Sequence, residues 1–212
     1  MYYLIETKDQ LNRFFKDEGD ECYLQFITNN DEVHPKLQSL CALYLYSFSK
    51  EKGFIINLNH PEAFELDLPL DYLQSYTNVF VKEKTKALLH LPQLPYTDIQ
   101  SIYYLLKNEP LDPLPKTAAH TFYERKFGAN NVNKIIPLAK HYEALTQEFT
   151  ALNPYITNYK SEASNKWYNE ILTPTLAKMV SEGIKINGDF QKHFDIKEKF
   201  SIEDDKIYGW YN

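Results

Sequence analysis

Residues 40–58, with the sequence LCALYLYSFSKEKGFIINL, contain two apolar runs separated by a polar turn. Leu40–Phe48 is the longer run, and its nearly continuous apolar character is typical of a buried strand. Phe54–Leu58 is the shorter run. Because Lys50–Gly53 between them has the polar composition of a turn, we expect the two runs to pair as a β-hairpin.

The segments around this hairpin predict further strands. Cys22–Thr28 precedes it, Asn78–Val81 follows it, and Tyr2–Ile5 opens the chain as a short strand. Thr7 is expected to cap a helix, because Gln10 three residues later completes a capping-box pattern. Apolar spacing predicts further helices over residues 70–75, 87–89, 98–107, 117–127, 136–152 and 190–200. The fold class predicted from this order is α/β, a mixed sheet flanked by helices.

The composition is that of a globular protein and argues against a tight nucleic-acid binder. Hydrophobic residues make up 43% of the 212 residues and charged residues 25%, so a sizeable core is possible. The formal net charge is −6, whereas proteins that hold nucleic acids on their own are usually basic. A local basic stripe of Lys82, Lys84 and Lys86 is the candidate DNA-binding site. The alternative is a solvated strand edge or loop, where lysines discourage aggregation.

Other features of the sequence place the protein inside the cell and outside the membrane. The N-terminal residues do not form a signal peptide, and no apolar run reaches the roughly 18 residues of a membrane span. Cys22 and Cys41 lack metal-ligand spacing, so we expect buried free thiols in a reducing, cytoplasmic compartment. The histidines form no zinc-binding pattern, and no phosphate-binding glycine loop is present. We therefore expect no cofactor.

A more specific pattern stands near the C-terminal end. Residues 172–179, LTPTLAKM, and 182–187, EGIKIN, resemble a signature of family A DNA polymerases, in which a helix links the exonuclease domain to the polymerase domain. Residues 208–212, YGWYN, are similar to the start of a further motif in the polymerase thumb. Pro174 predicts either a kinked helix or a new helix capped by Thr173, and Gly183 a helix end. With Pro154 as the boundary, we expect an exonuclease-like domain over 1–153 and a helical segment leading into a polymerase domain over 154–212.

This resemblance implies a ribonuclease H-like exonuclease fold, in which the family uses four carboxylates to hold two divalent metals. The first two acids match Ile27 and Asn29 of this chain, and the third matches Lys86, with Lys82 in place of a family asparagine. The fourth matches Tyr142. A lysine cannot replace a metal-binding carboxylate at neutral pH. The resemblance therefore predicts a degenerate active site with no catalytic and no metal-binding residues.

Three hypotheses about function follow from these observations. The first is a non-catalytic exonuclease-like domain of a replicative DNA polymerase, with a structural or partner-binding role; it would meet DNA through the parent polymerase and contact other replication proteins. Its compact, degenerate form suggests a viral protein in a host cell. The second is an active 3′–5′ exonuclease that uses a shifted set of acids, Asp31, Glu32, Asp98 and Glu143. The third is an unrelated α/β interaction protein.

Overall fold

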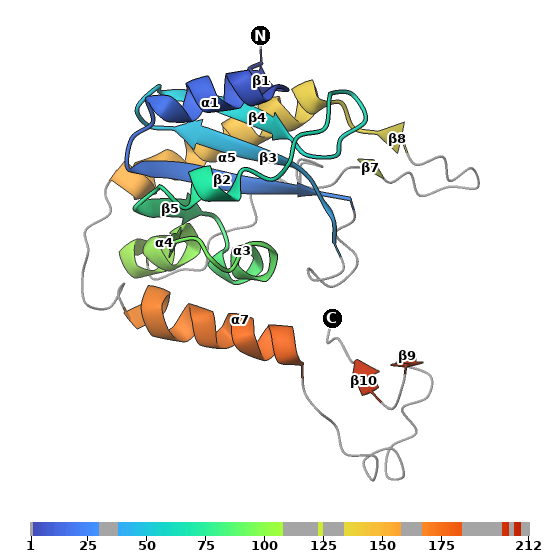
Figure 1. Cartoon of the computed structure of the whole chain (residues 1–212). Coiled ribbons are helices and arrows are strands. Elements are labelled where there is room, and N and C mark those ends of the chain that lie inside the picture. The colour runs from blue at the N-terminus through green and yellow to red at the C-terminus, as the bar shows by residue number, and fades with distance from the viewer. Residues whose placement is uncertain are drawn as a thin grey trace, which may run out of the picture.

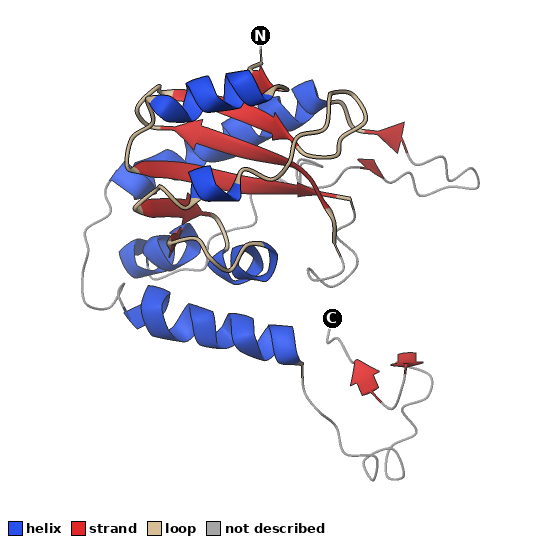
Figure 2. Cartoon of the chain, in the orientation of Figure 1, coloured by secondary structure: helices blue, strands red, loops and turns tan. Residues whose placement is uncertain are grey.

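The computed structural model describes residues 2–29, 38–107, 123–124, 134–157, 167–183, 201–203 and 206–208. Their centre is a six-stranded sheet with helices on both sides (Figures 1 and 2). In spatial order, the strands are β1 (Leu4–Ile5), β4 (Lys52–Asn57), β3 (Leu40–Ser47), β2 (Glu21–Thr28), β5 (Asn78–Val81) and β6 (Tyr96–Asp98). The helices are α1 (Lys8–Lys16), α2 (Leu70–Leu73), α3 (Lys84–His90), α4 (Ile99–Lys107), α5 (Leu138–Thr157), the π-helical turn η3 (Tyr168–Leu172) and α7 (Thr173–Glu182).

The sheet is mixed, as the sequence predicts. Strands β2, β3 and β4 form an antiparallel meander, whereas β1 pairs with β4, and β5 with β2 and β6, in parallel. The predicted hairpin has Ala42 opposite Asn57 and Ser47 opposite Lys52. The α/β fold class is thus confirmed. The strand β6 was not predicted, because three residues directly after Pro95 are too short to show a period.

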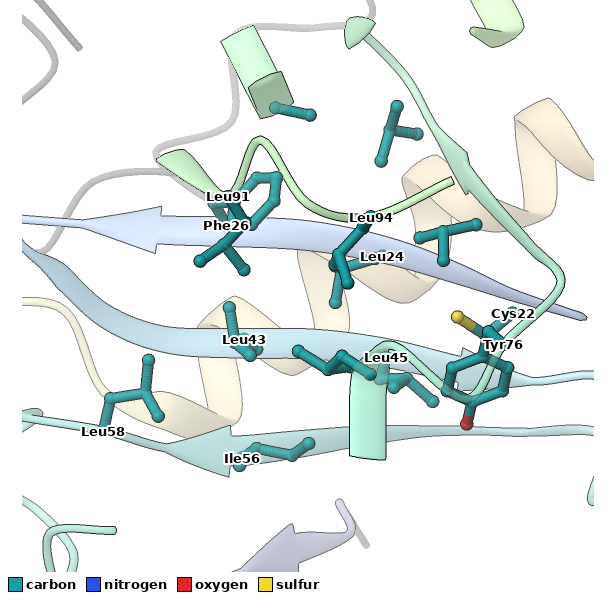
Figure 3. Close-up of a cluster of buried hydrophobic side chains, with 14 of the residues drawn as sticks. Cys22, Leu24, Phe26, Leu43, Leu45, Ile56, Leu58, Tyr76, Leu91 and Leu94 are labelled. Atoms are coloured by element: carbon teal, nitrogen blue, oxygen red, sulfur yellow. The ribbon is translucent and has the colours of Figure 1, made fainter. Parts of the chain in front are cut away.

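Two hydrophobic clusters cover the two faces of the sheet. On one face, Leu11 and Phe14 of α1 join residues of β2, β3 and β4, and Figure 3 shows Leu24, Leu43 and Ile56 among them. On the other face, α4 and α5 cover a second cluster, whose largest fully buried side chains include those of Tyr23, Ile27, Tyr44, Ile55, Phe80, Ile99 and Leu138. Successive residues of β2 alternate between the two clusters, as the two-residue period of a strand requires.

Local signals account for the helix ends near the sheet. The Thr7 side chain accepts a hydrogen bond from the Gln10 amide at 3.2 Å, and the Gln10 side chain accepts one from the Thr7 amide, so the predicted capping box is confirmed. Gly183 ends α7 at φ +69°, a left-handed conformation that glycine adopts without strain. None of the helices among the described residues is long and apolar enough to cross a membrane.

Some predicted elements differ from the structure. Tyr123–Glu124 within the expected helix over 117–127 forms a short strand, β7, that pairs with β8 (Lys134–Ile135), so the helix is wrong at these two residues. Pairing across strands overrides local helical spacing here. A further two-stranded pair joins β9 (Ser201–Glu203) to β10 (Lys206–Tyr208). The predicted helix over 190–200 lies outside the described residues.

The two proline-containing helices also refine the sequence reading. Helix α5 continues through Pro154 to Thr157, and the division into 1–153 and 154–212 stays a prediction. At Pro174, η3 passes directly into α7, because Leu172 has helical φ and ψ angles of −66° and −55°. Leu172 occupies the N-cap position of α7, so Thr173 does not cap a new helix. The helix is thus interrupted before Pro174 by the π-helical turn η3.

Candidate functional site

Four polar side chains meet where β2, β5 and α5 come together on the α5 face of the sheet. Tyr23 and Gln25 belong to β2, Lys82 directly follows β5, and Glu148 lies on α5. Tyr23 is opposite Phe80 in the parallel β2–β5 pair, and Gln25 and Lys82 each lie two residues further along. We refer to these four residues as the Glu148 cluster.

Both oxygen atoms of the Glu148 carboxylate accept hydrogen bonds within this cluster. The Tyr23 hydroxyl donates to Oε1 at 3.0 Å, and the Lys82 ammonium donates to Oε2 at 3.0 Å. Gln25 Nε2 in turn donates to the Tyr23 hydroxyl at 2.9 Å. Tyr23 is 0% and Glu148 7% exposed, so the carboxylate sits in the interior with an ammonium as its counter-ion.

The electrostatics of the cluster favour this fixed arrangement. Burial raises the pKa of Tyr23 well above its usual value, and the neighbouring Glu148 charge raises it further. The Tyr23 hydroxyl therefore keeps its proton at neutral pH and remains a donor to Glu148. A buried carboxylate requires a paired charge and hydrogen bonds, and Lys82 and Tyr23 supply both.

The residues that match the acids of the family occupy other surroundings. Ile27 is fully buried in the core beneath α5. The Asn29 side chain accepts a hydrogen bond from the Ser39 amide at 2.9 Å and so supports the chain after β2. Tyr142 is half-buried, and its ring lies 6.1 Å from that of Tyr44. None of these side chains can bind a metal as a carboxylate does.

The three candidate DNA-binding lysines have three different environments. Lys82 pairs with Glu148, and Lys86 is half-buried on α3. Lys84 is only 7% exposed, and its ammonium donates to the carbonyls of Tyr96 at 2.7 Å and Asn169 at 2.6 Å. The ammonium groups of Lys82 and Lys84 are thus both engaged within the protein. DNA binding by the three lysines stays a prediction.

The shifted set of acids is not assembled in the part of the chain that the structure describes. Asp98 is buried at the end of β6, where it accepts hydrogen bonds from the Lys84 amide at 3.2 Å and the Ser101 hydroxyl at 2.6 Å. Burial raises the pKa of Asp98, and these hydrogen bonds lower it. Glu143 is exposed on α5, and Asp31 and Glu32 lie outside the described residues. Asp98 therefore links the starts of α3 and α4.

The Glu148 cluster was not found from the sequence, although one signal for it was present. The buried positions of α5 are Leu138, His141, Leu145, Glu148, Phe149, Leu152 and Ile156. A carboxylate within such an apolar stripe must have a partner, because an unpaired buried charge is too costly. The partners Tyr23 and Lys82 lie 125 and 66 residues away, so the sequence could not identify them.

The cluster does not fit the two divalent cations that the resemblance to the exonuclease family implies. Hard cations such as Mg²⁺ and Mn²⁺ prefer several carboxylate or carbonyl oxygens, whereas this cluster offers one carboxylate that already binds an ammonium. Within the described ranges, no three His, Cys, Asp or Glu side chains lie together so that they could hold a metal.

No family model and no curated protein matches this chain. Solved structures do match it. RNase D of Trypanosoma brucei in complex with RNA U12 is 15% identical with a TM-score of 0.51, over 88% of this chain and 72% of that chain. A second match, described as the apo form of a nuclease, is 12% identical with a TM-score of 0.51, over 86% and 93% of the two chains. RNase D of Escherichia coli matches at 15% identity and a TM-score of 0.45, over 87% and 51%.

These comparisons agree with the architecture described above. The chain has the ribonuclease H-like fold of RNase D-like 3′–5′ exonucleases. At such low identity the likeness extends to the fold, whereas the chemistry has to be argued from the residues of this chain.

Proposed function

We propose that this chain is a non-catalytic exonuclease-like domain with a structural or partner-binding role. The observation that carries this proposal is the ion pair between Lys82 and Glu148 at the point where β2, β5 and α5 meet. The carboxylate is committed to an internal cation and to the Tyr23 hydroxyl, and Gln25 beside it is neutral at every pH of interest.

The physical reason why the domain would be non-catalytic lies in how two metal ions hydrolyse a phosphodiester. Two cations about 4 Å apart must stabilise the attacking and the leaving oxygen, and several fixed carboxylates must hold them. The Lys82 ammonium gives Glu148 its positive partner but carries no bound water that could attack a phosphate. The net charge of −6 also lowers the local concentration of an anionic substrate.

We further propose that the domain belongs to a DNA polymerase and takes part in DNA replication. The support is the resemblance of residues 172–187 to the family A signature, since α7 and Gly183 have the helix and the glycine end that this signature describes. In that setting the domain braces the polymerase domain or binds replication proteins, and meets DNA only through its parent. A viral origin is part of the same proposal. Reading the gene beyond Asn212 for polymerase motifs tests it.

The alternative is an active 3′–5′ exonuclease, which the fold shared with T. brucei RNase D favours. The test incubates 3′-labelled single-stranded DNA and RNA with the purified chain and Mg²⁺ or Mn²⁺. We expect no shortening above the level of a matched preparation of a variant with Asp31→Ala, Glu32→Ala, Asp98→Asn and Glu143→Ala. A second control preparation carries Glu148→Gln. Steady shortening by the natural chain that either variant lacks would overturn the proposal.

A further inference from the structure

The helical segment 167–183 packs against α3 through small side chains. Thr173 and Ala177 are buried there, whereas Leu176 and Met179 of the same helix are 44% and 60% exposed. Figure 1 shows α7 beside α3 at the edge of the domain. Polar contacts with Lys84 of α3 and Asp98 of β6 add to this packing.

The backbone of this segment contains a carbonyl for which the π-helical hydrogen-bond pattern offers no donor. In a π-helical turn, the carbonyl of a residue accepts a hydrogen bond from the amide five residues later. For Asn169 in η3, that residue is Pro174, which has no amide hydrogen. Asn169 is buried, so its carbonyl requires another donor.

Lys84 supplies that donor from α3. Its ammonium donates to the Asn169 carbonyl at 2.6 Å and to the Tyr96 carbonyl of β6 at 2.7 Å. The Asn169 side chain accepts a further hydrogen bond from the Asp98 amide at 2.8 Å. One residue of the helical segment is therefore held by both its main chain and its side chain to the corner formed by α3 and β6.

We propose that Lys84 is a latch that fixes residues 167–183 to the sheet domain, and that this segment detaches as a unit when the latch opens. The charge of the ammonium makes each of its hydrogen bonds stronger than a neutral one, and its loss removes a donor from two carbonyls. The latch depends on Pro174, because an amide at this position would satisfy the same carbonyl. The Asp98 carboxylate and Glu170 favour the charged form of Lys84, whose pKa burial lowers.

Hydrogen exchange measured by mass spectrometry on the full chain tests this proposal. We expect Lys84→Met to raise the exchange rate of the amides of 169–183 by about tenfold or more, since local opening is set by the contacts that are lost. Peptides from β2 and β3 should change by less than about twofold, because their opening is global. Lys86→Met on the same helix is the matched control, and we expect no change in 169–183.

The role of the proline is tested by a second substitution. Pro174→Ala adds an amide that can donate to the Asn169 carbonyl, so it should restore most of the protection in the Lys84→Met background. Thr175→Ala raises helix propensity without adding a donor and should restore less. Equal rescue by Pro174→Ala and Thr175→Ala would overturn the latch. It would also be overturned if Lys84→Met left the exchange of 169–183 unchanged, or accelerated exchange in β2 and β3 to the same extent. If Lys84→Met does not fold, Lys84→Gln, which removes the ammonium but keeps a polar side chain, replaces it. Faster exchange confined to 169–183 then supports the latch, and an unchanged rate overturns it.

Discussion

Replacing Lys82 by Met should destabilise the domain by leaving the Glu148 carboxylate without its counter-ion. Breaking a fully buried ion pair costs about 3–5 kcal/mol. The Lys82 side chain is 21% exposed and that of Glu148 is 5% exposed, so water partly replaces the lost ammonium. The Tyr23 hydroxyl still donates to the carboxylate at the other oxygen. We therefore expect a loss of about 2 kcal/mol in the free energy of unfolding.

Urea unfolding followed by circular dichroism measures this loss. For a slope of about 2–3 kcal/mol per molar, the midpoint should fall by roughly 0.8 M. Glu148→Gln removes the charge but keeps an oxygen that can accept from Tyr23, so the double variant with Lys82→Met should recover about 1 kcal/mol or more. Lys86→Met, which removes a half-buried lysine on α3, serves as the control. A Lys82→Met midpoint within 0.2 M of the natural chain, or no recovery in the double variant, would refute the reasoning.

Three further predictions follow from single contacts. Burial and the nearby Lys86 lower the pKa of His90 to about 4, so the stability it contributes is present above the unfolded pKa of about 6.5 and is lost as the pH falls from 6.5 towards 4. After a discount for partial exposure, this contribution to the free energy of unfolding is about 2 kcal/mol. The fall in the urea midpoint between pH 6.5 and 4 that corresponds to it should be absent in His90→Phe. Gly53→Ala should cost about 1–3 kcal/mol, because its Cβ would meet the Tyr44 ring, whereas Gly19→Ala, with ordinary contact distances, should cost less than about 1 kcal/mol; thermal unfolding compares the two. Thr7→Ala should lower stability by about 1 kcal/mol in the same assay, and an unchanged melting temperature would mean that the capping box contributes nothing.

The sequence predicted those parts of the fold that depend on neighbours along the chain. The hairpin of β3 and β4 follows from two apolar runs and a turn, and the start of α1 follows from Thr7 and Gln10. The strand β6 and the strand pair β7–β8 were missed because two or three residues show no period, and only pairing defines them. The π-helical turn at η3 could not be predicted, since Pro174 is compatible with several helix distortions. The Lys84 ammonium, which donates to a carbonyl of this turn, comes from α3 and is distant in the sequence.

The candidate site was predicted less well than the fold, because its residues meet only after folding. Matching of motifs directed attention to Ile27 and Tyr142, whereas the polar contacts form at other positions of the same elements, at Gln25 of β2 and Glu148 of α5. The positions that the match assigned to metal ligands hold isoleucine, asparagine, lysine and tyrosine, none of which is a carboxylate. A better signal was Glu148 itself, a charged residue within the buried stripe of α5.

The lysines at 82, 84 and 86 show why spacing alone misleads at the end of a strand. Residues two apart share one face only while the strand continues, and β5 ends at Val81, after which α3 begins at Lys84. The change of period sends Lys82 to α5 and Lys84 to η3, so what resembles a basic stripe becomes two internal cations that serve different contacts. Lys82 neutralises the Glu148 carboxylate, and Lys84 donates to the Asn169 carbonyl. At this corner of the fold, lysine ammonium groups therefore hold α5 and η3 in place.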